Sequence, residues 1–182
     1  MGFKLQTTDI EDLLILEPAV FGDERGYFLE TYNEKAFAEI GLNMRFVQDN
    51  LSYSRKGILR GLHFQAPPSA QGKLVSVVKG HVLDVAVDIR KNSPTYGKHE
   101  MVHLSDENRK LFYIPPGFAH GFLVISEECY FSYKCTGGYD RSAEGGLMWN
   151  DPALGIDWQA TNPVISEKDT LYMSFDAFES PF

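Results

Sequence analysis

The sequence predicts an all-β fold, a β-sandwich or barrel of short strands with one short helix. Apolar and aromatic residues fall in short runs, and glycine, proline or polar residues end each run. Many short strands at close, regular spacing are typical of sandwiches and barrels. No linker, exact repeat or low-complexity tract divides the 182 residues, so we expect one domain over residues 1–182.

The N-terminal part of the chain is predicted to contain strands and the one helix. Residues 1–20 are expected to form a lead-in strand, and residues 27–32 a second strand after a charged turn. The helix is predicted over residues 33–40. Asn33 is a favourable N-cap, and Gly41 is a favourable residue just after the last turn.

The rest of the chain is predicted to form strands separated by turns. Their ranges are 46–54, 58–65, 73–79, 81–90, 99–104, 111–114, 121–125, 128–136 and 146–149. In 81–90 the odd positions from 83 to 89 are apolar and share one face, while Asp84 and Asp88 lie on the other.

The two cysteines, Cys129 and Cys135, share one face of a predicted strand with Phe131 and Tyr133. Six strand residues span about 20 Å, which is too far for a disulfide. We therefore expect two small buried thiols in a reducing compartment. This face is expected to point inward, so the Tyr133 hydroxyl needs a partner, either a backbone carbonyl or a bound ligand.

Composition and charge restrict the class of protein. The formal net charge is −8, which argues against non-specific binding to nucleic acid but not against a small anionic ligand in a cationic pocket. The apolar runs are too short to span a bilayer. Acidic residues interrupt the start of the chain, where a secretory signal needs an apolar core. We expect a cytoplasmic protein with no membrane or nucleic-acid partner.

Residues 46–73 carry an unusual number of polar side chains for strands. These are Gln48, Asp49, Asn50, Arg60, His63, Gln65 and Lys73. Polar groups are costly to bury without partners, so the cluster favours a ligand site. His63 could be a structural residue or an acid–base catalyst. Arg60 and His63 are three apart and would face opposite sides of a regular strand, but Gly61 between them permits a bulge.

The sequence does not predict a metal site. Pro115, Gly117 and His120 match the P-x-G-x-x-H half of the cupin signature. The other half usually supplies two histidines and a glutamate, whereas here His63 is followed by Gln65 and no acid. One histidine with one glutamine is a poor divalent site. The chain also has no Gly-rich phosphate loop that opens a helix.

The strongest pattern is an ordered set of motifs between about residues 21 and 169: FVQDNLSYS, LRGLHFQ, GKLVSVVKGHVLDVAVDIRKNSPTYG and YIPPGFAHGF. This set resembles the dTDP-4-dehydrorhamnose 3,5-epimerase family of nucleotide-sugar enzymes. The resemblance implies a cupin-type jelly roll with one short helix and small peripheral helical turns. It also implies a homodimer that epimerises dTDP-4-dehydro-6-deoxy-D-glucose at C3 and C5 to dTDP-4-dehydro-L-rhamnose without a metal or any other cofactor.

The resemblance assigns roles to individual residues. It implies His63 as the base, Asp169 as the carboxylate that orients it, Tyr133 as the opposing acid and Lys73 as the cation near the ketone oxygen. The residues implied in substrate binding are Arg25, Glu30, Gln48, Asp49, Asn50, Arg60, His120, Tyr139, Glu144 and Lys168. Strand exchange between subunits would bring Arg25 and Glu30 to the neighbouring site.

Two features depart from the family pattern. Tyr139 is followed by Asp140-Arg141 where the family commonly has Tyr-x-Pro, and the tail after Asp169 matches no motif. Three alternatives stay open at this point. They are an epimerase that acts at C3 or C5 only, a cupin that binds a sugar nucleotide without catalysis, and a metal-dependent cupin oxygenase.

Overall fold

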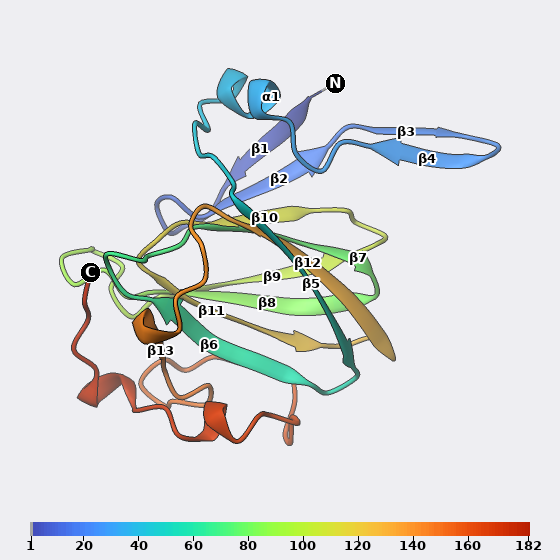
Figure 1. The fold of residues 1–182 in the computed structure, drawn as a ribbon. Helices are drawn as coiled ribbons and strands as arrows, with labels where there is room; N and C mark the ends of the chain where they lie inside the picture. Colours follow the sequence, from blue (N-terminus) through green and yellow to red (C-terminus); the bar gives the residue numbers. More distant parts are fainter. Residues whose placement is uncertain (1) are drawn as a thin grey trace.

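The computed structural model describes residues 2–182 and consists mainly of two facing β-sheets (Figure 1). The strands are β1 (Phe3–Thr7), β2 (Leu14–Pro18), β3 (Val20–Asp23), β4 (Gly26–Leu29), β5 (Gln48–Arg55), β6 (Leu59–Gln65), β7 (Lys73–Lys79), β8 (His81–Asp88), β9 (His99–Ser105), β10 (Leu111–Ile114), β11 (Phe118–Val124), β12 (Glu128–Cys135) and β13 (Glu144–Gly146). The helical elements are α1 (Glu34–Glu39) and the 3-10 turns η1 (Arg141–Ala143), η2 (Lys168–Thr170) and η3 (Phe175–Ala177).

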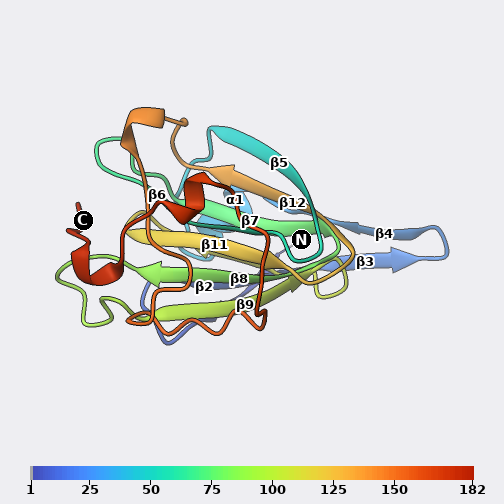
Figure 2. The same ribbon diagram turned by 90° about the horizontal axis from the view of Figure 1, so that it is seen from below.

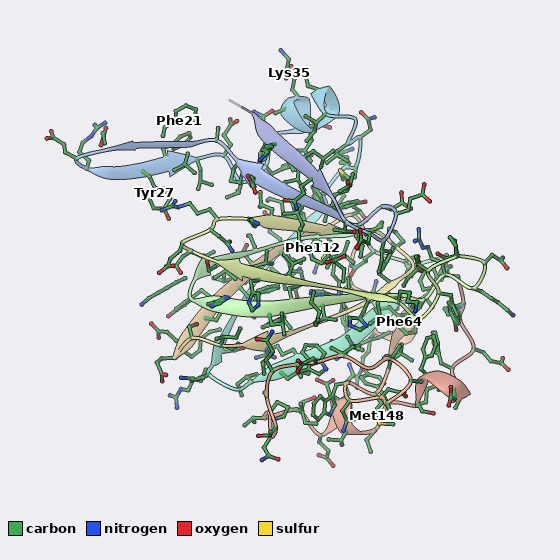
Figure 3. All side chains as sticks on the ribbon, turned by 180° about the vertical axis from the view of Figure 1, so that it is seen from behind. Phe21, Tyr27, Lys35, Phe64, Phe112 and Met148 are labelled. Atoms are coloured by element: carbon green, nitrogen blue, oxygen red, sulfur yellow. The ribbon has the colours of Figure 1, made fainter. Side chains whose placement is uncertain are left out.

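The two main sheets enclose the principal hydrophobic core. One has the strand order β1-β2-β10-β7-β12-β5, the other has the order β13-β6-β11-β8-β9, and neighbouring strands are antiparallel. Their inner faces contribute buried residues such as Phe112, Phe131 and Phe122 to one cluster. Figure 3 shows Phe112 within this core. The predicted all-β jelly roll with one short helix is confirmed.

Strand β8 is buried on both faces, and this explains the C-terminal tail. Its inward side chains, including Val82 and Ala86, belong to the core between the sheets. Its outward side chains pack in a second cluster with Leu147, Leu154 and Trp158. The segment after β13 therefore covers the outer face of the five-stranded sheet (Figure 2). Each face of β8 is apolar because each has its own cover, apart from the two buried acids at 84 and 88.

The prediction for residues 1–20 was wrong in its number of strands. The segment folds back on itself as the antiparallel pair β1 and β2, which extends the six-stranded sheet. The next two strands, β3 and β4, form a separate hairpin that projects from the body (Figure 1). Phe21 and Tyr27 lie on this hairpin (Figure 3), with about half of their surface exposed (50% and 55%).

The predicted helix is confirmed, with its N-cap. Asn33 Oδ1 accepts a hydrogen bond of 3.1 Å from the Ala36 amide, which satisfies a donor of the first turn. Gly41 follows the helix with a φ of 85°, a conformation that glycine adopts readily. No helix within residues 2–182 is long and apolar enough to cross a membrane. Both cysteines are buried and free.

Strand β11 begins three residues earlier than the predicted start at position 121, so His120 lies within a strand. Gly121 lies in the middle of the strand. A Cβ atom there would lie 2.7 Å from the Arg60 carbonyl oxygen, so the glycine permits close approach of β6. The last strand also differs, since β13 covers residues 144–146 instead of 146–149.

Candidate active site

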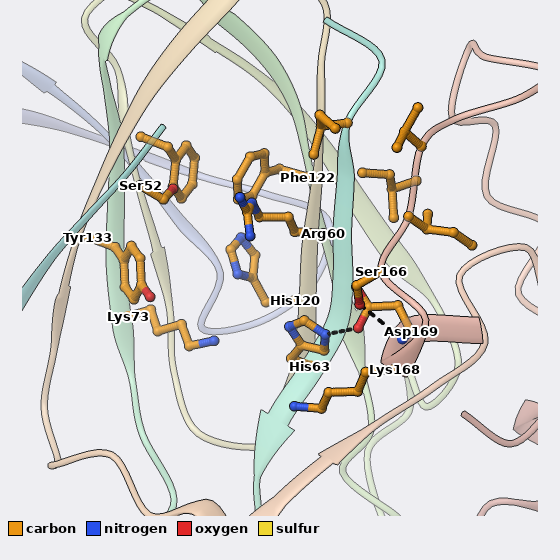
Figure 4. Close-up of a pocket in the computed structure, with 15 residues that line it drawn as sticks. Ser52, Arg60, His63, Lys73, His120, Phe122, Tyr133, Ser166, Lys168 and Asp169 are labelled. Atoms are coloured by element: carbon orange, nitrogen blue, oxygen red, sulfur yellow. Dashed lines mark hydrogen bonds and ion pairs between the residues drawn. The ribbon is translucent and has the colours of Figure 1, made fainter. Parts of the chain in front are cut away.

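A cavity of about 460 Å³ lies between the sheets, and all four predicted catalytic side chains line it (Figure 4). Strands β5, β6, β7, β11 and β12 contribute to its wall, and the segment around η2 contributes the rest. The predicted residues that line it are Arg60, His63, Lys73, His120, Tyr133, Lys168 and Asp169. The sheets thus bring together residues from distant parts of the sequence.

A bulge in β6 allows Arg60 and His63 to face the same cavity. In the pairing with β11, His63 lies opposite His120 and Arg60 lies opposite Phe122, so two residues of β6 face the single residue Gly121. Gly61 has a φ of 129°, and a Cβ atom on it would lie 2.5 Å from the Gly121 Cα atom. Glycine is therefore required at position 61 by both conformation and space, and the predicted bulge is present.

His63 is paired with Asp169. The Nε2 atom of His63 lies 2.6 Å from Oδ1 of Asp169, although 106 residues separate them in sequence. Asp169 is only 3% exposed. Burial raises the pKa of Asp169, but the hydrogen bond with His63 and the amide of Gly61 outweigh it, and its pKa is held below the ordinary value. An ionised Asp169 accepts from Nε2–H, which leaves Nδ1 of His63 free to take a proton.

Lys73 supplies the positive charge in the middle of the cavity. Its amine points into the space between Tyr133 and His63 (Figure 4). Within residues 2–182 this amine has no hydrogen-bond or ion-pair partner. Burial lowers the pKa of Lys73, and the neighbouring groups of Cys135, Asp84 and Glu144 oppose that shift. A half-buried lysine amine without a partner is, when protonated, well suited to hold an oxygen that becomes negatively charged.

Tyr133 lies across the cavity from His63 (Figure 4). Burial raises the pKa of Tyr133, so its hydroxyl stays protonated at neutral pH. The hydroxyl makes no hydrogen bond to another group in residues 2–182, and a backbone carbonyl is not its partner. Because Tyr133 lines the cavity, its proton is available to a ligand.

A second carboxylate–histidine pair was missed in the sequence. Both carboxylate oxygens of Asp84 lie 3.0 Å from Nε2 of His120. Asp84 is fully buried, and desolvation raises its pKa even though His120 and Lys73 oppose this. Burial lowers the pKa of His120. The sequence did contain a signal for this pair, because Asp84 is an acidic residue in an otherwise apolar strand. It was missed because the face of residues 83 to 89 that carries the apolar side chains is the opposite one, whereas Asp84 points inward.

Four predicted binding residues form a hydrogen-bonded chain that reaches the cavity through Lys168. The Gln48 side chain donates to Asn50 (3.0 Å) and accepts from the Tyr139 amide (3.0 Å). The Tyr139 hydroxyl donates to Glu144 (3.0 Å), and Glu144 pairs with Lys168 at 2.5 Å. These four side chains do not line the cavity themselves.

Three predicted binding residues lie away from the cavity. Asp49 follows Gln48 on β5, points to the opposite face of the sheet and pairs with Lys134 at 2.9 Å, so its carboxylate does not face the cavity. Arg25 lies on the projecting hairpin and pairs with Asp23. Glu30 accepts a hydrogen bond of 3.1 Å from Asn33.

Aromatic residues build the apolar wall of the cavity; Phe131 was predicted to point inward, but Phe122 was not singled out in the sequence. The rings of Phe122 and Phe131 are stacked with centroids 4.1 Å apart. Ser52 and Ser166 also line the cavity, with no sequence motif to mark them. Within residues 2–182, no group of three or more His, Cys, Asp or Glu side chains is placed to hold a metal ion.

Comparison with known proteins agrees with this geometry. Residues 7–177 match the family model described as dTDP-4-dehydrorhamnose 3,5-epimerase. The dTDP-4-dehydrorhamnose 3,5-epimerase of Methanothermobacter thermautotrophicus is 55% identical over 170 residues, which cover 92% of this chain and 91% of that protein.

Two solved structures are also similar. The dTDP-4-dehydrorhamnose 3,5-epimerase of Elizabethkingia anophelis is 52% identical, with a TM-score of 0.92 and coverage of 97% of this chain and 98% of that one. A 3,5-epimerase of Legionella pneumophila, solved with dTDP-4-keto-L-rhamnose, is 47% identical, with a TM-score of 0.94 and coverage of 98% and 95%. The chain therefore belongs to the dTDP-4-dehydrorhamnose 3,5-epimerase family.

Proposed function

We propose that this protein epimerises dTDP-4-dehydro-6-deoxy-D-glucose at C3 and C5 to give dTDP-4-dehydro-L-rhamnose. The observation that carries the proposal is the arrangement in one cavity of the His63–Asp169 pair, the Lys73 amine and the Tyr133 hydroxyl. A base and an acid on opposite sides of a substrate, with a cation between them, are what inversion beside a ketone requires.

Each epimerisation consists of a removal and a return of one proton. Nδ1 of His63 takes the proton from C3 or C5, and the electron pair of the broken C–H bond delocalises into the C4 carbonyl as an enolate. The Lys73 ammonium stabilises the enolate oxygen. Tyr133 donates a proton to the carbon from the opposite face, which inverts it. The proton on His63 and the proton lost by Tyr133 balance through exchange with water.

The charges of these groups suit the reaction at neutral pH. The lowered pKa of Asp169 keeps it ionised, so that it holds His63 by Nε2–H and stabilises the imidazolium that forms. The raised pKa of Tyr133 keeps its proton until the enolate is ready to receive it. No nicotinamide or metal is needed, because the ketone itself makes the neighbouring protons acidic.

The substrate's nucleotide and phosphates are assigned to the predicted binding residues. Arg60 and Lys168 line the cavity and supply positive charge for a pyrophosphate, and His120 lies deeper beside Asp84. We assign Gln48, Asn50, Tyr139 and Glu144 to the outer part of the ligand. Tyr139 is 60% exposed, so its ring is free to stack on a base.

The remaining predictions concern assembly and location. Arg25 and Glu30 do not line their own chain's cavity, which supports the prediction that the hairpin serves a neighbouring subunit in a homodimer. Asp49 pairs with Lys134 outside the cavity, so we do not assign it to substrate binding. The cytoplasmic location and the single domain over residues 1–182 stay predictions, and the free Cys129 and Cys135 are compatible with a reducing compartment.

The test is proton NMR of dTDP-4-dehydro-6-deoxy-D-glucose with the protein in D₂O, with no metal or nicotinamide added. We expect loss of the H3 and H5 signals and deuterium in an L-configured product. Exchange at one carbon only would replace the proposal with a mono-epimerase. Binding without exchange at either carbon would replace it with a non-catalytic sugar-nucleotide protein.

A further inference from the structure

Tyr172, in the tail that matched no sequence motif, lies directly beside His63. Two contacts fix its position. Leu147 and Met173 form an isolated parallel bridge, and the Met148 amide donates a hydrogen bond of 2.9 Å to the Met173 carbonyl. Gly146 pairs with His63 in the β13–β6 register. The segment at Tyr172 therefore runs along β13, on the far side of that short strand from β6.

The ring of Tyr172 packs over Gly146, a residue of β13 that has no side chain. A Cβ atom on Gly146 would lie 2.5 Å and 2.6 Å from two carbons of the Tyr172 ring, so the ring occupies the place a side chain would take. It reaches the imidazole of His63 in an edge contact, with ring centroids 5.7 Å apart and planes at 66°. His63 is thus held by Asp169 at Nε2 and by an aromatic ring against the imidazole itself.

The hydroxyl of Tyr172 does not account for this arrangement. Its oxygen is buried, its polar neighbour is the Lys168 ammonium, and Tyr172 does not line the cavity. Burial raises the pKa of this hydroxyl, and the Lys168 ammonium opposes the shift. Lys168 is half exposed and already paired with Glu144, so its contact with the Tyr172 hydroxyl is expected to contribute little. The ring is therefore the part of the side chain that matters.

We propose that Tyr172 is a positioning residue for the base, and that its ring fixes the plane of the His63 imidazole so that Nε2 reaches Asp169 while Nδ1 faces the cavity. This inference rests on the proposed function for its effect on rate. A loosely held imidazole would keep its chemistry but would spend less time in the productive orientation. The tail thereby contributes to catalysis as well as covering the sheet.

Three variants test the inference. Tyr172→Ala removes the ring, and Tyr172→Phe removes only the hydroxyl. Phe175→Ala removes another tail aromatic, which contacts Tyr96 with centroids 5.0 Å apart and not His63. We expect kcat to fall about 10- to 100-fold in Tyr172→Ala with KM changed much less, because orientation and not binding is lost. Tyr172→Phe is expected to keep the wild-type kcat, because it keeps the ring. Phe175→Ala is expected to lower thermal stability without lowering kcat.

Proton NMR supplies a readout that needs no turnover. The His63 Nε2–H proton, bonded to a carboxylate at 2.6 Å, is expected to give a far-downfield signal, which its absence in His63→Ala would assign. It is expected to persist in Tyr172→Phe and to broaden or vanish in Tyr172→Ala.

The possible results distinguish the positioning of His63 by Tyr172 from the proposed epimerase activity. An unchanged kcat and an intact signal in Tyr172→Ala would overturn the inference. So would a Tyr172→Phe variant as slow as Tyr172→Ala, or an equal loss of kcat in Phe175→Ala. If the wild-type protein exchanges neither H3 nor H5, while the downfield signal still depends on the ring, the proposed function fails and the positioning of His63 by Tyr172 stands.

Discussion

Two buried carboxylates in this molecule have pKa values displaced in opposite directions, and the difference follows from their contacts. Asp169 accepts hydrogen bonds from His63 and the Gly61 amide, and its pKa is lowered. Asp84 is fully buried, and desolvation dominates, so its pKa is raised. The first carboxylate suits a partner for the base. The second carboxylate is bonded to His120 and lies near the Lys73 amine, whose pKa it raises.

Replacement of Asp84 by asparagine is expected to impair the enolate step. Lys73 then loses a nearby anion that raises its pKa, so its pKa falls further and the neutral amine becomes populated at lower pH. We expect kcat to fall about 10-fold at pH 8 and to recover in part as the pH is lowered. A pH–kcat profile measures this. Glu127→Gln, which removes a charge on the exposed Glu127–Lys56 pair, is the matched control. A uniform loss across pH would contradict the assignment.

At the scale of elements, the bulge in β6 determines whether Arg60 and His63 share the cavity. The bulge depends on Gly61, which has a positive φ and lies against the backbone of Gly121. The sequence allowed this feature to be predicted because the spacing of Arg60 and His63 conflicted with strand alternation, and a glycine stood between them. The start of β11 was missed because the predicted strand began only at Gly121, whereas β11 begins at Phe118.

Gly61→Ala is expected to destabilise the protein by about 3 kcal/mol, since strain in the backbone adds to a clash with Gly121. Gly57→Ala is the matched control. It also has a positive φ, 78°, but a Cβ atom there meets nothing within 4 Å, so about 1 kcal/mol is expected from strain alone. Urea unfolding measures both. Equal losses in the two variants would show that the close approach of the two strands is unimportant.

At the scale of the whole molecule, the contacts that complete the site were beyond reach of any local pattern. His63 and Asp169 meet across 106 residues, and Tyr172 comes from a tail with no motif. The alternation of strands predicted which side chains point inward, but not which strands lie side by side. Motifs matched to a family named the catalytic residues, whereas Asp84 and the aromatic wall became evident only from burial and contacts.

Global stability is expected to fall in acid because of Asp88. Burial raises the pKa of this carboxyl, but hydrogen bonds from Arg90, Ser93 and Thr95 outweigh that and lower it to about 2. A lowered folded pKa gives stability that is present above the ordinary value of 3.8 and lost as the pH falls to about 2.

The loss amounts to about 2 kcal/mol between pH 4 and pH 2. Urea unfolding at a series of pH values measures it. Asp88→Asn is expected to flatten this part of the curve, and an unchanged slope in that variant would assign the acid sensitivity to other carboxyls.

The homodimer proposal predicts complementation between two inactive variants. Arg25→Ala keeps His63 in its own site but removes the arginine from the neighbouring site. His63→Ala removes the base from its own site but still supplies Arg25 to the neighbouring one. Mixed after unfolding and refolding together, half of the dimers are heterodimers with one complete site, so about a quarter of the wild-type activity should return. No recovery beyond the sum of the separate variants would place Arg25 in its own subunit's site or outside catalysis.

In the proposed mechanism one base, His63, removes the protons from both C3 and C5, and Tyr133 returns them on the opposite face. Its most direct test is deuterium release to water from substrate labelled at C3 or at C5. We predict that Tyr133→Phe still releases both labels while it forms product about 100-fold more slowly, and that His63→Ala releases neither. Release of either label by His63→Ala would contradict the account, because a second base would then have to exist.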